Sequence, residues 1–318
     1  MIKPNSPIKD AAAVWLSDLQ EDARLSINTR KVYASSLNRH VIGSKDNPSS
    51  LANLTVREVK VVGIERWLRG IGKASGPDAM KTARSVLSGV LALAVKHEAI
   101  PHNPVRDVGH VAVPTRDSER DRQRAFTREE REAVLVFAEA DPTTRRRDLP
   151  DLLAFMAGTG ARIGEACGVR WSDVDLDLGT AELGSLPVRV PGAGLVLQPH
   201  GKTKGSTRTV VLPPWLVSRL MDRKVNAVPN EWDVVFCSAL GKLRDTSNTS
   251  KHVRALLDAA GFEWAVGHTF RKTVATWLDE DGVSGRQVAN QLGHAKPSMT
   301  MDHYMSRRAV TERAALVL

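Results

Sequence analysis

Residues 294–304 read HAKPSMTMDHY, and the candidate chemistry of the chain is arranged around this stretch. It begins with the histidine of a Leu-Gly-His sequence and ends at Tyr304, one of only two tyrosines. Upstream, His268 and Arg271 are spaced i, i+3, so a helix would place both on one face. Earlier still, residues 160–165 read GARIGE and supply a second arginine. Arginines, histidines and one tyrosine, without clustered carboxylates, suit a site that holds a phosphodiester and attacks it.

Taken together, these motifs resemble the tyrosine recombinase (phage integrase) family over nearly the whole chain. The resemblance implies six catalytic residues in the family's order: Arg162, Lys202, His268, Arg271, His294 and Tyr304. It also implies a supporting role for Glu165, which completes an A-R-x-x-E pattern. The lysine has one competitor, because Lys204 lies two residues further on with the same strand parity. Lys202 is favoured because it precedes Arg208 by six residues, as in the K-T…R-T-V layout of phage integrases.

The composition describes a basic globular protein. The chain has 318 residues, of which 42% are hydrophobic, and this length is enough for two domains with cores of their own. The formal net charge of +9 favours a polyanionic partner, although a basic protein that binds no nucleic acid has a similar balance. The family resemblance implies that this partner is double-stranded DNA carrying inverted core sites.

The same composition argues against several other classes of protein. Cys167 and Cys237 lack a C-x-x-C or zinc-ligand spacing, so we expect reduced thiols and no metal site. No apolar run approaches 18 residues and the N-terminus has no signal pattern, so we expect a cytoplasmic protein without a membrane partner. The implied chemistry requires no cofactor.

Residues 1–112 carry four helical patterns. We expect helices over residues 10–20, from about residue 28, over 56–68 with a stop at Gly70, and from just after Pro77 to just before Pro101. The resemblance implies that this bundle is a core-binding, SAM-like DNA-binding domain. Tyr33 lies on an apolar stripe, so we expect it to pack in a core or against DNA rather than act as a nucleophile.

Residues 113–125 form a highly charged interdomain linker. Such a stretch can be a solvated, flexible connection, and it can also lie along phosphates while two domains clamp a duplex. The candidate DNA contacts are the linker arginines and three basic residues further along: Arg116, Arg120, Arg122, Arg124, Lys204, Arg244 and Lys251.

Residues 126–318 are expected to form an α+β catalytic domain with a C-terminal tail. Thr127 and Glu130 make a capping box that starts a helix, and a turn over 158–160 leads into the helix that bears Arg162. Three short runs read as strands, 179–184, 194–198 and 207–212, whereas the insert 185–194 has no functional interpretation. The predicted fold class is mainly α with a small antiparallel β-sheet, in the two-domain tyrosine recombinase architecture.

The resemblance implies that Tyr304 attacks a phosphodiester and becomes a 3′-phosphotyrosyl enzyme. Arg162 and Arg271 would each fork onto the non-bridging oxygens, which ammonium groups cannot do. We expect His268 to accept the phenol proton, because an unperturbed tyrosine has a pKa of about 10. The two remaining roles are a hydrogen bond from His294 to a non-bridging oxygen and protonation of the leaving 5′-oxygen by Lys202.

The residue set favours the integrase of a phage or mobile element, and a Xer-like recombinase that resolves chromosomes or plasmids has the same signature. A non-catalytic DNA-binding regulator would not need Tyr304, and a type IB topoisomerase normally carries a lysine in place of His268. Because the core-binding helices begin near residue 10, we expect an arm-less enzyme that binds only short core sites. The family implies a homotetramer on synapsed DNA, a monomer or weak oligomer when free, and a C-terminal tail that docks on its own or a neighbouring subunit.

Overall fold

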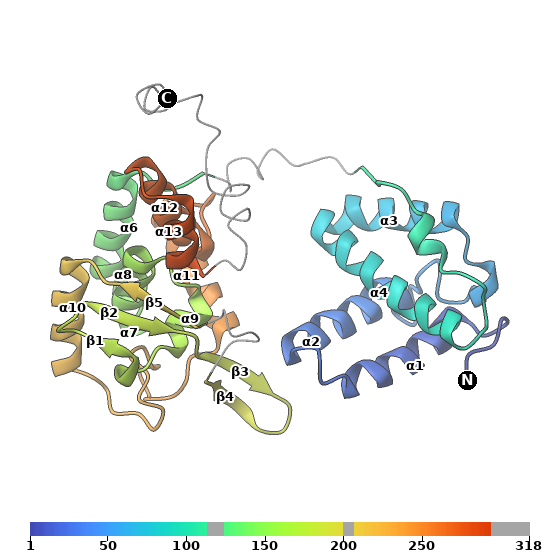
Figure 1. The fold of residues 1–318 in the computed structure, drawn as a ribbon, viewed down its shortest axis with the longest axis horizontal. Helices are drawn as coiled ribbons and strands as arrows, with labels where there is room; N and C mark the ends of the chain where they lie inside the picture. The colour runs from blue at the N-terminus through green and yellow to red at the C-terminus, as the bar shows by residue number, and fades with distance from the viewer. Residues whose placement is uncertain (113–123, 200–206, 294–318) are drawn as a thin grey trace. The chain divides into compact units, whose positions relative to one another are not determined.

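The computed structural model of the protein describes residues 1–112, 124–199 and 207–293. The chain divides into two compact units, Met1–Arg116 (unit 1) and Asp117–Leu318 (unit 2), which run from blue to green and from green to red in Figure 1. Each unit has a hydrophobic core of its own. Most of the predicted linker, 113–125, lies outside the described residues, and Phe126 already belongs to the core of unit 2.

Unit 1 is helical, and its longest helix forms the centre of its core. Its elements are α1 (Ile8–Glu21), α2 (Ile27–Ser36), the π-helix η1 (Leu37–Ile42), the 3₁₀ turn η2 (Val56–Glu58), α3 (Val61–Ser75), α4 (Pro77–Lys96) and the 3₁₀ turn η3 (Pro104–Asp107). Leu87, Val90 and Leu91 of α4 are fully buried. Tyr33 on α2 is half-buried and its ring centre lies 6.3 Å from that of Trp15, which is a packing position.

For the third helix, predicted over 56–68 with a stop at Gly70, both predicted ends are wrong. The chain makes a separate turn at η2, which a capping box between Thr55 and Glu58 begins, and α3 then continues past Gly70 to Ser75. A glycine inside a helix costs about 1 kcal/mol, and the burial of Trp67, Leu68 and Ile71 on the same helix offsets that cost. The helix ends at Gly76, whose φ of +89° suits glycine.

Unit 2 combines helices with small β-sheets. Its helices are α6 (Arg128–Ala140), α7 (Pro142–Arg146), α8 (Pro150–Thr159), α9 (Ile163–Gly168), the 3₁₀ turn η4 (Trp171–Asp173), α10 (Pro214–Val225), α11 (Thr246–Ala259), α12 (Gly267–Glu280) and α13 (Gly285–Leu292). The predicted capping box starts α6: Glu130 N donates to Thr127 Oγ1 over 3.2 Å, and Thr127 N donates to Glu130 Oε2 over 2.9 Å. Most residues of α8 are buried, so α8 lies in the middle of this core.

The described strands form two antiparallel sheets rather than one. Strands β1 (Val174–Asp175), β2 (Thr180–Leu183) and β5 (Arg208–Val211) pair in the order β1-β2-β5, with Ala181 opposite both Val174 and Val210. The insert that had no interpretation supplies β3 (Leu186–Val190), which pairs with β4 (Gly194–Gln198) as a hairpin visible at the edge of unit 2 in Figure 1. The predicted class, mainly α with small antiparallel sheets, is confirmed.

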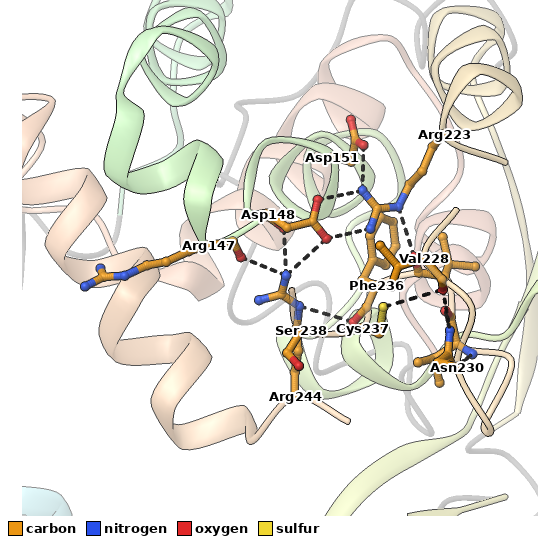
Figure 2. Close-up of polar contacts among 12 residues, drawn as sticks. Arg147, Asp148, Asp151, Arg223, Val228, Asn230, Phe236, Cys237, Ser238 and Arg244 are labelled. Atoms are coloured by element: carbon orange, nitrogen blue, oxygen red, sulfur yellow. Dashed lines mark hydrogen bonds and ion pairs between the residues drawn. The ribbon is translucent and has the colours of Figure 1, made fainter. Parts of the chain in front are cut away.

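A largely buried polar network joins segments of unit 2 that are far apart in the sequence (Figure 2). Arg223 on α10 donates to both carboxylate oxygens of Asp148, over 2.9 and 2.6 Å, and to Asp151 over 2.7 Å. Arg244 donates to the carbonyl oxygens of Arg147 and Asp148, both over 2.8 Å, and to that of Phe236. These charge-assisted hydrogen bonds connect α10, the start of α8 and residues 234–244 to one another.

Candidate active site

The candidate site of unit 2 is built where helices end. Helix α8 terminates at Gly160, whose φ of +69° is left-handed, and a Cβ there would lie only 2.9 Å from Leu292 Cδ2. Glycine therefore lets the end of α8 approach the end of α13. Arg162 was predicted inside a helix, but it is the N-cap of α9 and has an extended backbone, with φ −68° and ψ 149°. The turn from α8 into α9 thus displays Arg162 at a helix start.

Glu165, on α9, is the carboxylate on which the site is organised. Its side chain is 6% exposed and accepts four hydrogen bonds: from Arg162 N over 2.8 Å, Arg162 Nη1 over 2.7 Å, Arg208 Nη1 over 3.0 Å and Arg208 Nη2 over 2.9 Å. Burial raises the pKa of Glu165, but the bonds and charges of Arg208 and Arg162 outweigh burial and lower that pKa to about 2. Glu165 is therefore ionised throughout the physiological range.

The two arginines of the predicted clamp occupy different environments. The Arg162 side chain is 45% exposed, so its guanidinium is accessible to a ligand. Arg271 is 1% exposed and donates through Nη1 to the Gly160 carbonyl over 3.0 Å and through Nη2 to the Leu292 carbonyl. These carbonyls lie at the C-terminal ends of α8 and α13, where the helix dipole favours a cation.

His268 is the second residue of α12 and lies one turn before Arg271. Its side chain is exposed at the surface of unit 2. Partial desolvation, followed by the positive charges of Arg271, Arg162 and Lys272, lowers its pKa below 6.5. The imidazole is therefore neutral at pH 7 and can accept a proton. The influence of both arginines on this pKa shows that three of the six predicted catalytic residues share one electrostatic environment.

The other predicted positions of the catalytic set, Lys202, His294 and Tyr304, lie outside the described residues, as does the alternative lysine, Lys204. The same is true of three predicted DNA contacts in the linker: Arg116, Arg120 and Arg122.

Arg208, the first residue of β5, belongs to the site although the sequence prediction gave it no role. Besides its two bonds to Glu165, it donates through Nε to the Gln291 carbonyl over 2.9 Å, and its side chain is 7% exposed. The sequence signal was available in the K-T…R-T-V layout that helped to choose Lys202. That layout indicated which lysine to choose, but it did not indicate that Arg208 binds Glu165.

The described candidates for DNA contact differ in how accessible they are. Lys251 on α11 is exposed. Arg124 makes two bonds to Glu130, over 2.9 and 2.8 Å, and its guanidinium stacks 3.7 Å from the ring centre of Trp264, which holds it on its own unit. Arg244 is 6% exposed and its bonds go to the buried network of Figure 2, so its placement contradicts the expected phosphate contact and makes it a structural residue.

The described residues contain no group of three or more His, Cys, Asp or Glu side chains placed to hold a metal ion. Within the same ranges, no helix is long and apolar enough to cross a membrane. Cys167 and Cys237 are free and buried, and burial raises the pKa of the Cys167 thiol to about 11. Both cysteines are therefore weak nucleophiles.

Comparisons with known proteins bear on this geometry. A family model described as the phage integrase family matches residues 124–309. The integrase of Mycobacterium phage L5 is 26% identical over 98% of this chain and 81% of its own length. A XerC-like tyrosine recombinase from Caldanaerobacter subterraneus is 32% identical over 48% of this chain, and the match spans 44% of that relative.

Two solved structures share the fold of the chain. The Tn1549 transposon integrase in complex with circular intermediate DNA has a TM-score of 0.77 at 17% identity, covering 96% of this chain and 98% of that one. A lambda integrase tetramer bound to a Holliday junction has a TM-score of 0.68 at 18% identity, covering 97% and 80%. At these identities the likeness shows a common architecture and no more.

Proposed function

This chain belongs to the phage integrase family of tyrosine recombinases, and we propose that it is a site-specific DNA recombinase that cleaves and rejoins strands through a 3′-phosphotyrosyl intermediate. The observation that supports this best is the cluster of Arg162, at the start of α9, with Arg271 and neutral His268 of α12, against the C-terminal ends of α8 and α13. Guanidinium groups next to an imidazole that can accept a proton suit attack on a phosphodiester.

The arginines would stabilise the charge that builds on the non-bridging oxygens during attack. Arg162 offers a half-exposed guanidinium, and Arg271 is fixed by two carbonyl oxygens. Removing one pre-aimed donor from such a site typically costs about 2.7–4 kcal/mol, or a factor of 10²–10³ in rate. Glu165 would orient Arg162, because it contacts both the backbone and the guanidinium of that residue.

Tyr304 is the proposed nucleophile, and His268 is its proposed proton acceptor. A lowered histidine pKa keeps the imidazole unprotonated at neutral pH, which a base requires. His294 would donate to a non-bridging oxygen, and Lys202, or in its place Lys204, would protonate the leaving 5′-oxygen. The phosphotyrosyl bond conserves the energy of the broken bond, so rejoining to another strand needs no ATP.

Unit 1 is proposed as the core-binding domain, with a groove between α2, η1 and the start of α4 as one of its DNA contacts. The residues that line the groove include Lys31, Arg39, His40, Asp78, Ser35 and Thr82. Cations and hydroxyls are the side chains that most often bind phosphate.

The favoured biological role is that of an integrase of a phage or mobile element. The protein would act in the cytoplasm, where such DNA enters and integrates. The phage L5 integrase matches 98% of the chain, whereas the XerC-like relative matches 48%. Double-stranded DNA with inverted core sites is the proposed substrate. Assembly as a tetramer on synapsed DNA is proposed by analogy with the lambda integrase tetramer on a Holliday junction.

The test is covalent trapping. The core site is first identified by selecting, from a pool of random duplexes, those that the protein binds. A nick beside the cleavage position then makes cleavage irreversible. Wild type should form a protein–DNA adduct that survives a denaturing gel, whereas Tyr304→Phe should bind the duplex and form none. Equal adduct yield from Tyr304→Phe would exclude Tyr304 as the nucleophile. A substrate with a 5′-thio leaving group should rescue Lys202→Ala but not Lys204→Ala if Lys202 is the acid.

A further inference from the structure

Arg208 joins three segments of unit 2 that contain or adjoin the proposed catalytic residues. It makes two bonds to Glu165, which in turn holds Arg162, and a third bond to the Gln291 carbonyl near the end of α13. Gly293, the last described residue, lies against it: a Cβ at Gly293 would be 2.7 Å from Arg208 Cδ and 2.8 Å from Nη1. No side chain fits at Gly293 unless Arg208 moves.

We propose that Arg208 is a positioning residue for strand cleavage, which neutralises Glu165 so that Arg162 stays available to the scissile phosphate. This inference rests on the proposed function. It also gives Arg208 a second task, because β5 follows the segment with Lys202 and Gln291 lies three residues before His294 in the sequence. The Arg208 guanidinium therefore connects β5 to α9, through Glu165, and to the end of α13, through the Gln291 carbonyl.

The electrostatic step concerns what Glu165 would do alone. A carboxylate and a guanidinium form a two-bond fork when nothing else competes. With Arg208 in place, both Glu165 oxygens are shared, and Arg162 gives this carboxylate one guanidinium nitrogen, Nη1, and its backbone N–H. Two guanidiniums and one carboxylate leave a net positive charge facing the ligand. Without Arg208, Glu165 and Arg162 would form a neutral pair, which would stabilise the additional charge of the transition state far less.

A contribution to fold stability alone does not account for the ion pair between Arg208 and Glu165. Both side chains are nearly buried, at 7% and 6% exposed, and desolvation offsets much of the gain from a buried ion pair. Replacing both partners by uncharged side chains of similar size is often neutral, whereas removing one leaves a buried charge. The double replacement therefore separates the effect of the charge of Glu165 from the effect of lost packing.

The experiment compares Arg208→Met, Arg208→Lys and the double variant Arg208→Met/Glu165→Gln in the full chain, with the nicked duplex at saturating protein. Arg208→Met should lower the single-turnover adduct rate about 10²-fold, while the dissociation constant for uncleaved duplex stays within about threefold, as expected for a loss confined to the transition state. Arg208→Lys, which keeps the charge but not the fork, should lose less. The double variant should recover at least about tenfold over Arg208→Met, because no uncompensated carboxylate remains.

Arg223→Met is the matched control, because Arg223 is also nearly buried, at 11% exposed, and binds two carboxylates, but within the network of Figure 2. It should lower the melting temperature and leave the adduct rate per folded molecule unchanged. The inference is overturned if the double variant is no faster than Arg208→Met, if Arg208→Lys and Arg208→Met both react like wild type, or if Arg223→Met loses rate equally. A wild type that forms no adduct overturns the proposed function, and the role of Arg208 with it.

Discussion

Acidification should remove a defined share of the stability of unit 2, because Glu165 is held ionised in the folded chain. Burial opposes its charge, but Arg208 and Arg162 prevail and lower the pKa of Glu165 from 4.5 to about 2. A depressed pKa in the folded state means that the unfolded chain binds the proton more readily. The stabilisation is therefore fully present above pH 4.5 and is lost as the pH falls from there towards 2.

The size of this effect follows from the two pKa values. Complete loss corresponds to roughly 3 kcal/mol, at about 1.4 kcal/mol for each tenfold change in proton affinity. At pH 3.5 the unfolded carboxyl is mostly protonated while the folded one is still ionised, and roughly 1.4 kcal/mol is lost. Hydrogen bonds also lower the pKa of other carboxylates, such as Glu130 and Asp141, so these groups contribute to the loss of stability in acid as well. The contribution of Glu165 must therefore be measured as a difference.

Glu165→Gln provides that difference. Urea unfolding of the full chain, followed by tryptophan fluorescence, gives the free energy of unfolding of both proteins at pH 6 and pH 3.5. The free energy of unfolding of wild type should exceed that of Glu165→Gln by roughly 1.4 kcal/mol less at pH 3.5 than at pH 6. Glu182→Gln, which changes an exposed carboxylate on β2, is the control and should show no comparable change. An advantage that stays constant with pH would refute the reasoning.

Three further outcomes are expected from individual contacts. Gly293→Ala should lower the adduct rate about tenfold or more, because the added Cβ would overlap the Arg208 side chain. Gly261 also has a left-handed backbone but has open space around it, so Gly261→Ala controls for backbone strain. Equal losses of rate in the two variants would contradict this account. Arg39→Ala should weaken duplex binding and reduce the dependence of log K on log salt by about 1, measured by fluorescence anisotropy, whereas Lys96→Ala at the far end of α4 should not. Arg244→Met should cost about 3–5 kcal/mol in urea unfolding, against less than about 0.5 kcal/mol for Lys251→Met, and similar costs would return Arg244 to the surface.

The sequence was sufficient to predict local features of the site. The capping box at Thr127 and the helical spacing of His268 and Arg271 depend on residues within one turn, and both occur in the structure. Gly160 marks a helix end because its left-handed backbone suits glycine. These features need no knowledge of the rest of the chain. The roles of Lys202, His294 and Tyr304 remain predictions, because those residues lie outside the described ranges.

Long-range partners could not be predicted in the same way. Arg208 and Glu165 are 43 residues apart, and Arg244 and Asp148 are 96 apart, so no local pattern connects them. A basic residue next to a helix start resembles surface charge until tertiary packing buries it, which is why Arg244 was misassigned. Strand β3 was missed for a similar reason, since its register depends on β4 and not on its own alternation.

The structure also separates two arginines that the motif treats alike. Arg271 is buried and bonded to carbonyls at the ends of α8 and α13, whereas the guanidinium of Arg162 is half-exposed and held from one side by Glu165. A group fixed by backbone carbonyls can move only if the helices move, so Arg271 would act as the fixed reference for the phosphate. In the proposed mechanism, the exposed side of the Arg162 guanidinium would adjust to the bound DNA. In the proposed mechanism, the geometry of the reaction would therefore depend on the contact between Gly160 and Leu292 as directly as on the charged side chains, because any change that separates those helix ends would displace Arg271.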